Sequence, residues 1–99
     1  MWTWDNIPEA FGNRLRVSVL GILIGGERDF AELRQLTGAS DGNLSVQTGR
    51  LEEWGYLEKQ RGFAGNKTRS TYRLTAKGIA EYRAYASLLA RAILERGSL

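Results

Sequence analysis

Apolar and polar positions alternate along the chain in patterns that predict six regular elements. The first is a helix that begins after Asn13, a residue suited to capping a helix N-terminus. Its apolar residues recur at the spacing of a single buried helix face: Leu15, Val19, Ile22 and Leu23. The Gly25-Gly26 pair that follows ends this helix.

Two further short helices are predicted between residues 29 and 55. Asp29 and Glu32 have the spacing of a capping box, and the helix they open places Phe30, Leu33 and Leu36 on one side. Gly38 ends that helix, and Ser40 or Asp41 caps the next. The third helix should turn Leu44, Thr48 and Leu51 inward and end at Gly55. Two short helices joined by a tight, glycine-containing turn are typical of a helix-turn-helix.

The second half of the chain predicts a hairpin and a long helix. Residues 56–61 and 69–74 alternate as strands, and residues 62–68 supply the glycine and asparagine of a turn. Lys59 and Arg61 share the parity of Leu57, so either their stems snorkel at the sheet edge or a bulge shifts the register. Thr75 caps the last helix. The fold class is mainly α with a β-hairpin, in the order α-α-α-β-β-α.

Composition removes several classes of function. The 99 residues fit one domain, and the absence of Cys and His excludes disulfides, Cys/His zinc sites and Ser-His-Asp triads. No acid–base pair, phosphate-binding loop or metal cluster is recognisable, so we expect no enzyme activity, no cofactor and no metal. The apolar run at residues 17–24 is too short to span a bilayer, so we expect a cytoplasmic protein without a membrane partner.

The positive charge is concentrated in the predicted hairpin. The whole chain has 14 Lys and Arg against 11 Asp and Glu, a net charge of only +3. Six basic residues and no acidic one lie between residues 59 and 77, which leaves eight basic against eleven acidic residues elsewhere. A basic hairpin can lie along a DNA backbone or enter a minor groove. The alternative is a solvated edge whose charges prevent strand pairing with other chains.

Four stretches of the sequence together resemble a known family. They are Asn13–Arg16, Asp29–Leu33, Asp41–Ser45 with Leu51–Leu57, and Tyr72–Gly78. In this combination the chain resembles the small stand-alone winged helix-turn-helix transcriptional regulators of the MarR and ArsR type. The resemblance implies a dimer on double-stranded DNA, with two terminal helices pairing the subunits. An organic effector could bind between the dimer arms and the core, but no residue identifies one.

These observations give a single winged-helix domain over residues 1–99. Its parts are an N-terminal arm (1–12), a winged core (13–74) and a C-terminal dimerisation helix (75–96). The predicted recognition helix, residues 41–54, enters the major groove, and the basic wing, residues 59–73, contacts the backbone or minor groove. The predicted DNA-binding residues are Asn43, Ser45, Val46, Gln47, Arg50, Arg61, Lys67, Thr68 and Arg69.

The last helix has more apolar surface than a small core requires. A homodimer would use that surface and the tryptophans of the arm, although packing within the chain is the alternative. The predicted interface residues are Trp2, Trp4, Tyr82, Tyr85, Leu89 and Ile93.

Among the aromatic residues near the hairpin, only Phe63 is expected to be exposed. A second hypothesis is a winged-helix protein-interaction module, or an assembly subunit, without specific DNA binding.

Overall fold

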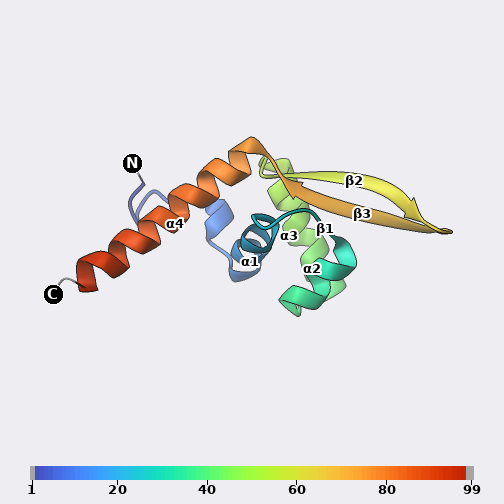
Figure 1. Cartoon of the computed structure of the whole chain (residues 1–99), viewed down its shortest axis with the longest axis horizontal. Helices are drawn as coiled ribbons and strands as arrows, with labels where there is room; N and C mark the ends of the chain where they lie inside the picture. Colours follow the sequence, from blue (N-terminus) through green and yellow to red (C-terminus); the bar gives the residue numbers. More distant parts are fainter. Residues whose placement is uncertain (1, 98–99) are drawn as a thin grey trace.

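The structure is a computed structural model that describes residues 2–97, with side chains through Glu95. The predicted order of three helices, a hairpin and a long helix is confirmed (Figure 1). A 3-10 helix lies in the N-terminal segment, where the sequence allows either an arm or a short helix that begins at Pro8, and a two-residue strand was not predicted. The elements are η1 (Glu9–Phe11), α1 (Arg14–Leu23), β1 (Arg28–Asp29), α2 (Phe30–Thr37), α3 (Asp41–Glu53), β2 (Leu57–Ala64), β3 (Lys67–Leu74) and α4 (Ala76–Gly97). Within the described chain, no helix combines the length and hydropathy needed to cross a bilayer.

Side-chain caps fix where the first three α-helices begin. Asn13 Oδ1 accepts the Arg16 backbone N–H at 3.0 Å, and Ser40 Oγ accepts that of Asn43 at 3.2 Å. Asp29 and Glu32 form both hydrogen bonds of the capping box, at 2.8 and 3.1 Å. The caps therefore place α2 and α3 on either side of a turn at residues 38–40, where Gly38 has a φ of +73°.

The core lies where α1, α2 and α3 meet the sheet. Its fully buried side chains are Val19, Leu20, Leu33, Leu44, Thr48 and Leu51. The inward face predicted for α3 is confirmed. The face predicted for α2 is partly wrong, because Leu36 is 59% exposed. The helix is only two turns long, and its last turn extends beyond the core.

The hairpin is longer than predicted. β2 and β3 pair without interruption from Leu57↔Leu74 to Ala64↔Lys67, and only Gly65 and Asn66 form the turn. Gly65 has a φ of +66°, which a residue with a side chain rarely adopts. The unbroken register excludes a bulge. Lys59 instead lays its stem along the sheet, with Nζ 5.9 Å from the centre of the Tyr72 ring.

The hairpin projects away from the body of the molecule, on the side opposite the free end of α4 (Figure 1). β1 pairs with β3, so the sheet has the order β1-β3-β2. Only the end of the hairpin near the body is covered by helices. The distal residues of both strands are exposed, as expected for a wing.

The N-terminal segment packs within its own chain. Phe11 is buried, stacks on Tyr85 of α4 at 4.6 Å between ring centroids, and meets Trp2 edge-on at 5.4 Å. The Trp2 carbonyl accepts a hydrogen bond from Arg91 of α4 at 3.2 Å. Of the two tryptophans predicted to lie in a dimer interface, Trp2 is therefore half-buried by its own chain, and Trp4 is exposed.

Arg16 of α1 is a buried charged residue, 2% exposed, which the sequence did not predict. Its guanidinium donates to the Glu9 carbonyl at 2.8 Å, to the Ala10 carbonyl at 3.2 Å and to Gln47 Oε1 of α3 at 2.7 Å. It also lies 5.1 Å from the centre of the Trp54 ring. One side chain thus joins η1, α1 and α3.

Replacing Arg16 should destabilise the whole fold. Arg16→Met keeps the aliphatic stem but leaves buried acceptors on Ala10 and Gln47 without donors, so we expect a loss of about 3 kcal/mol in the free energy of unfolding. The control is Arg14→Met, at an exposed position on the same helix, which should change stability by no more than about 0.5 kcal/mol. Urea denaturation measures both. A loss equal to that of the control would contradict the role given to Arg16.

Candidate nucleic-acid interface

The outward face of α3 presents a short polar stripe. Asn43, Val46 and Arg50 follow one another at helical spacing and are exposed, with Ser45 beside them. Asparagine and arginine have the donor and acceptor geometry that reads adenine and guanine edges in a major groove. Glu52 and Glu53 follow at the end of the helix. The part of α3 that suits an anionic partner is therefore its first three turns.

Gln47 does not belong to this stripe, and the prediction of its exposure was wrong. Its side chain is 7% exposed, and its Oε1 accepts the hydrogen bond from Arg16. The buried guanidinium needs an acceptor on the inner side of α3, and Gln47 is long enough to supply it. A glutamine so engaged stabilises the helix position and has no free edge for a base.

The wing has basic residues of two kinds. Arg69 pairs with Asp29 at 3.1 Å. At the end of the hairpin near the body, two N–H groups of Arg73 donate to Glu58 Oε2 at 2.8 and 2.6 Å. The Glu58 carboxylate raises the pKa of Arg73 further above its usual range. Arg61, one step farther from the tip than Arg69, and Lys67, at the tip, are exposed, and neither has an ion-pair partner in the part of the chain described.

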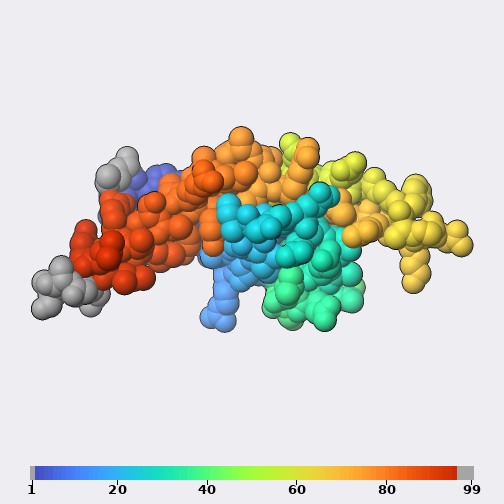
Figure 2. Space-filling model, in the orientation of Figure 1, coloured from blue at the N-terminus to red at the C-terminus, as the bar shows by residue number. Residues whose placement is uncertain are grey.

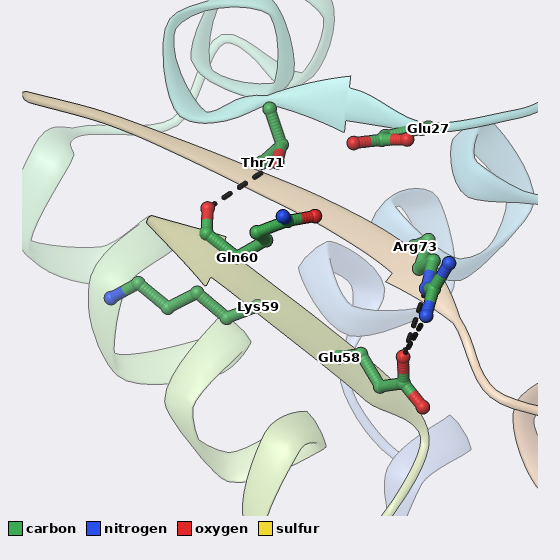
Figure 3. A pocket seen from close by; sticks show the side chains of 6 residues that line it. All are labelled: Glu27, Glu58, Lys59, Gln60, Thr71 and Arg73. Atoms are coloured by element: carbon green, nitrogen blue, oxygen red, sulfur yellow. Dashed lines mark hydrogen bonds and ion pairs between the residues drawn. The ribbon is translucent and has the colours of Figure 1, made fainter. Parts of the chain in front are cut away.

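Arg73 lies at the edge of a hollow on the outer face of the sheet, with a volume of about 300 Å³ (Figure 3). Glu58 and Glu27 reach the same hollow, from β2 and from the residue before β1, and Thr71 Oγ1 donates to the Gln60 carbonyl at 3.3 Å. Two carboxylates around one guanidinium leave no net positive charge there. This part of the wing is unsuited to phosphate.

A hydrogen-bonded joint connects the wing to α4. The Tyr56 hydroxyl donates to Glu81 Oε1, and the Lys77 ammonium donates to the Trp54 carbonyl at 2.7 Å while lying 4.9 Å from the centre of the Tyr56 ring. Burial, aided by the Glu81 carboxylate, raises the pKa of the Tyr56 phenol well above its usual value. Lys77, the last of the six basic residues of the hairpin region, is therefore engaged within the chain.

A comparison with known families decides which class of protein this is. A sequence profile described as winged helix DNA-binding domain matches residues 15–93. The chain belongs to this family. The match spans α1 through most of α4, so the winged helix includes the exposed stripe of α3 and the hairpin.

Solved structures agree with the family. A transcriptional regulator of the MarR family from Enterococcus faecalis V583 superposes with a TM-score of 0.79, at 21% identity, over 91% of this chain and 84% of the other. The transcriptional repressor BigR from Xylella fastidiosa gives a TM-score of 0.68 at 31% identity, over 88% of this chain and 84% of its own. The chain is accordingly a winged-helix DNA-binding domain similar to those of transcriptional regulators.

A third solved structure contains DNA. PadR from Bacillus subtilis, in complex with operator DNA, superposes with a TM-score of 0.69 at 19% identity. The superposition covers 75% of this chain and 47% of PadR. At this identity the likeness shows a shared fold.

The structure brings the remaining predicted DNA-binding residues to two places. Four are exposed on α3, and Arg61, Lys67, Thr68 and Arg69 lie on the wing. Arg69 differs from its neighbours because its guanidinium is held by Asp29, the N-cap of α2. Asp29 was recognised only as a cap, since its pairing with a residue forty positions away has no local sequence signal.

The six predicted dimer-interface residues also divide into two groups. Trp4, Leu89 and Ile93 are exposed, and Ile93 is 69% exposed. Trp2 and Tyr85 pack on Phe11, and the Tyr82 ring lies against Gly21 of α1. Intrachain packing therefore explains part of the apolar surface of α4 but leaves a stripe at its free end, to which Leu94 adds.

Proposed function

We propose that this winged helix binds a pseudo-palindromic duplex site as a homodimer, with α3 in the major groove and the wing against the backbone or minor groove. The observation that carries this proposal is the segregation of charge. Arg61 and Lys67 project from the wing without ion pairs in the described chain, and no acidic residue lies between residues 59 and 77. Cations so placed suit a chain of phosphates.

The two surfaces have different tasks in this proposal. Asn43, Val46 and Arg50 of α3 contact base edges, and Ser45 contacts a phosphate. The wing supplies most of the affinity, from Arg61 and Lys67, with Thr68 donating from the same end of the hairpin. PadR, which shares the fold, is seen with operator DNA, and this supports a duplex partner for the present chain.

The domain boundaries follow from the same proposal. Residues 13–74 form the DNA-binding core within a single domain of residues 1–99. The last helix, residues 75–96 as predicted, pairs the subunits through the exposed stripe of Leu89, Ile93 and Leu94. Symmetric pairing places two α3 helices on the same side of the dimer, where they meet half-sites roughly 34–36 Å apart.

Neutralising the wing cations should weaken duplex binding in a salt-dependent way. Arg61→Ala and Lys67→Ala should each lower the slope of log affinity against log salt concentration by about one, since each removes one phosphate contact. Arg83→Ala removes an equal charge from α4, beside the end of the hairpin nearest the body, and is the control. Fluorescence anisotropy across a salt series measures the slopes. Slopes equal to that of the Arg83 variant would exclude a wing contact with DNA.

Asp29 restrains DNA binding in this proposal by holding Arg69. Asp29→Asn retains the N-cap of α2, because asparagine caps about as well as aspartate, but removes the ion pair. Affinity for duplex should rise roughly two- to fivefold, the worth of an exposed ion pair.

The same anisotropy assay on the double variant Asp29→Asn with Arg69→Ala distinguishes two causes of a gain in affinity. One is the release of the Arg69 guanidinium, and the other is the loss of the negative charge of Asp29. The gain should disappear in the double variant. A gain that persists without Arg69 would show that the ion pair plays no part.

The exposed stripe of α4 should hold the dimer together. Ile93→Glu places a charge in the apolar stripe, and its exposure means that the fold of the monomer should tolerate it. Sedimentation equilibrium at micromolar concentration should show a dimer for the native chain and a monomer for this variant. Leu36→Glu, on the exposed end of α2, is the matched control and should remain dimeric. A native chain that sediments as a monomer would contradict the proposal.

A further inference from the structure

Phe63 is the most exposed large apolar side chain in the described part of the chain, at 79%. It lies on β2 close to the tip of the hairpin, which Figures 1 and 2 show projecting beyond the helices. A phenylalanine left in water forgoes about 2 kcal/mol of burial. The fold gains nothing from this side chain in return.

The hairpin does not need the Phe63 ring for its own structure. Its backbone pairs with Thr68 in an unbroken ladder, and the ring belongs neither to the core cluster nor to any of the ring pairs of the described residues. The tip turn is set by Gly65, which adopts a positive φ. An aromatic ring with no role in folding, close to the end of a projecting hairpin, is available to a partner.

The surroundings of Phe63 favour a polyanion. Arg61 lies two residues before it on the same face of β2, and Lys67 begins the facing strand. Neither cation has an ion pair in the described chain. The neighbouring apolar residue, Ala64, is the next residue of the strand and points to the opposite face. The ring therefore lacks the wider apolar patch that an apolar protein partner would need.

The shape of the tip suits a narrow groove. Gly62, Ala64 and Gly65 flank Phe63, and a Cβ placed at either glycine would meet no atom within 4 Å. The minor groove of B-DNA is about 6 Å wide, so a hairpin end without large neighbours can enter it. Strands of eight residues reach about 26 Å, which exceeds the roughly 17 Å that separate a major groove from the adjacent minor groove.

We infer that Phe63 is a minor-groove wedge that inserts its ring at a base step while Arg61 and Lys67 hold the flanking phosphates. This inference rests on the proposed function. Apolar wedges unstack and kink a duplex, and pyrimidine–purine steps such as TpA yield most easily. Phe63 therefore selects A·T-rich, deformable DNA beside the site that α3 reads. It does so at base pairs whose edges no polar side chain contacts.

The experiment compares two duplexes of equal length and charge, one rich in TpA steps and one of G·C pairs only. The native chain should bind the TpA duplex more tightly, and Phe63→Ala should lose about fivefold or more of that affinity, the worth of one stacked base. The dependence of its affinity on salt concentration should stay unchanged, because no charge is removed.

Two further variants are controls. Phe63→Leu keeps an apolar wedge and should keep most of the preference for the TpA duplex. Ile24→Ala, at the exposed apolar residue that follows α1, is the other control.

A fluorescent base reports the insertion itself. 2-Aminopurine at a TpA step should brighten when the native chain binds, should not brighten with Phe63→Ala, and should still brighten with Lys67→Ala once the duplex is saturated. Salt-dependent binding with equal affinities for native chain and Phe63→Ala would overturn the wedge alone. Absence of salt-dependent duplex binding by the native chain would overturn the proposed function. If Phe63→Ala leaves DNA binding unchanged but lowers the oligomeric mass of the protein without DNA, then Phe63 is a contact between subunits and the wedge is excluded.

Discussion

A buried guanidinium on α1 is the interaction on which the rest of this winged helix depends. Arg16 has almost no contact with water, so its N–H groups must find acceptors inside the protein. They find them on Glu9 and Ala10 of the N-terminal segment and on Gln47 of α3. The side chain that holds the N-terminal segment against the body also binds Gln47, and so determines which face of α3 turns outward.

The ion pairs of the wing determine which charges a partner meets. Arg69 and Arg73 are held by the carboxylates of Asp29 and Glu58. Arg61 and Lys67, both in the distal half of the hairpin, keep their positive charge without such partners in the described chain. A net charge of +3 is therefore consistent with a polyanion site, since the charge acts where the hairpin extends farthest.

Local rules predicted the helices, and long-range pairing explains what they missed. Caps such as Asn13 and Asp29 bond within three residues, so sequence alone located them. The exposure assigned to Gln47 assumed that a polar residue faces water. Arg16, thirty-one positions away, required the opposite. A charged residue amid the apolar positions of α1 was the available signal. The hairpin is longer than predicted because backbone pairing continues past Gly62, where apolar and polar residues no longer alternate along the sequence.

In the proposed complex, α3 reads the bases of each half-site while the wing tips of a symmetric dimer hold the flanking DNA. Selecting bound duplexes from a random pool with the native chain tests this most directly, because it reports binding, base preference and symmetry together. The account predicts two inverted half-sites centred about one helical turn apart, flanked by A·T-rich steps. A pool without an enriched sequence, or with one unpaired half-site, would contradict it.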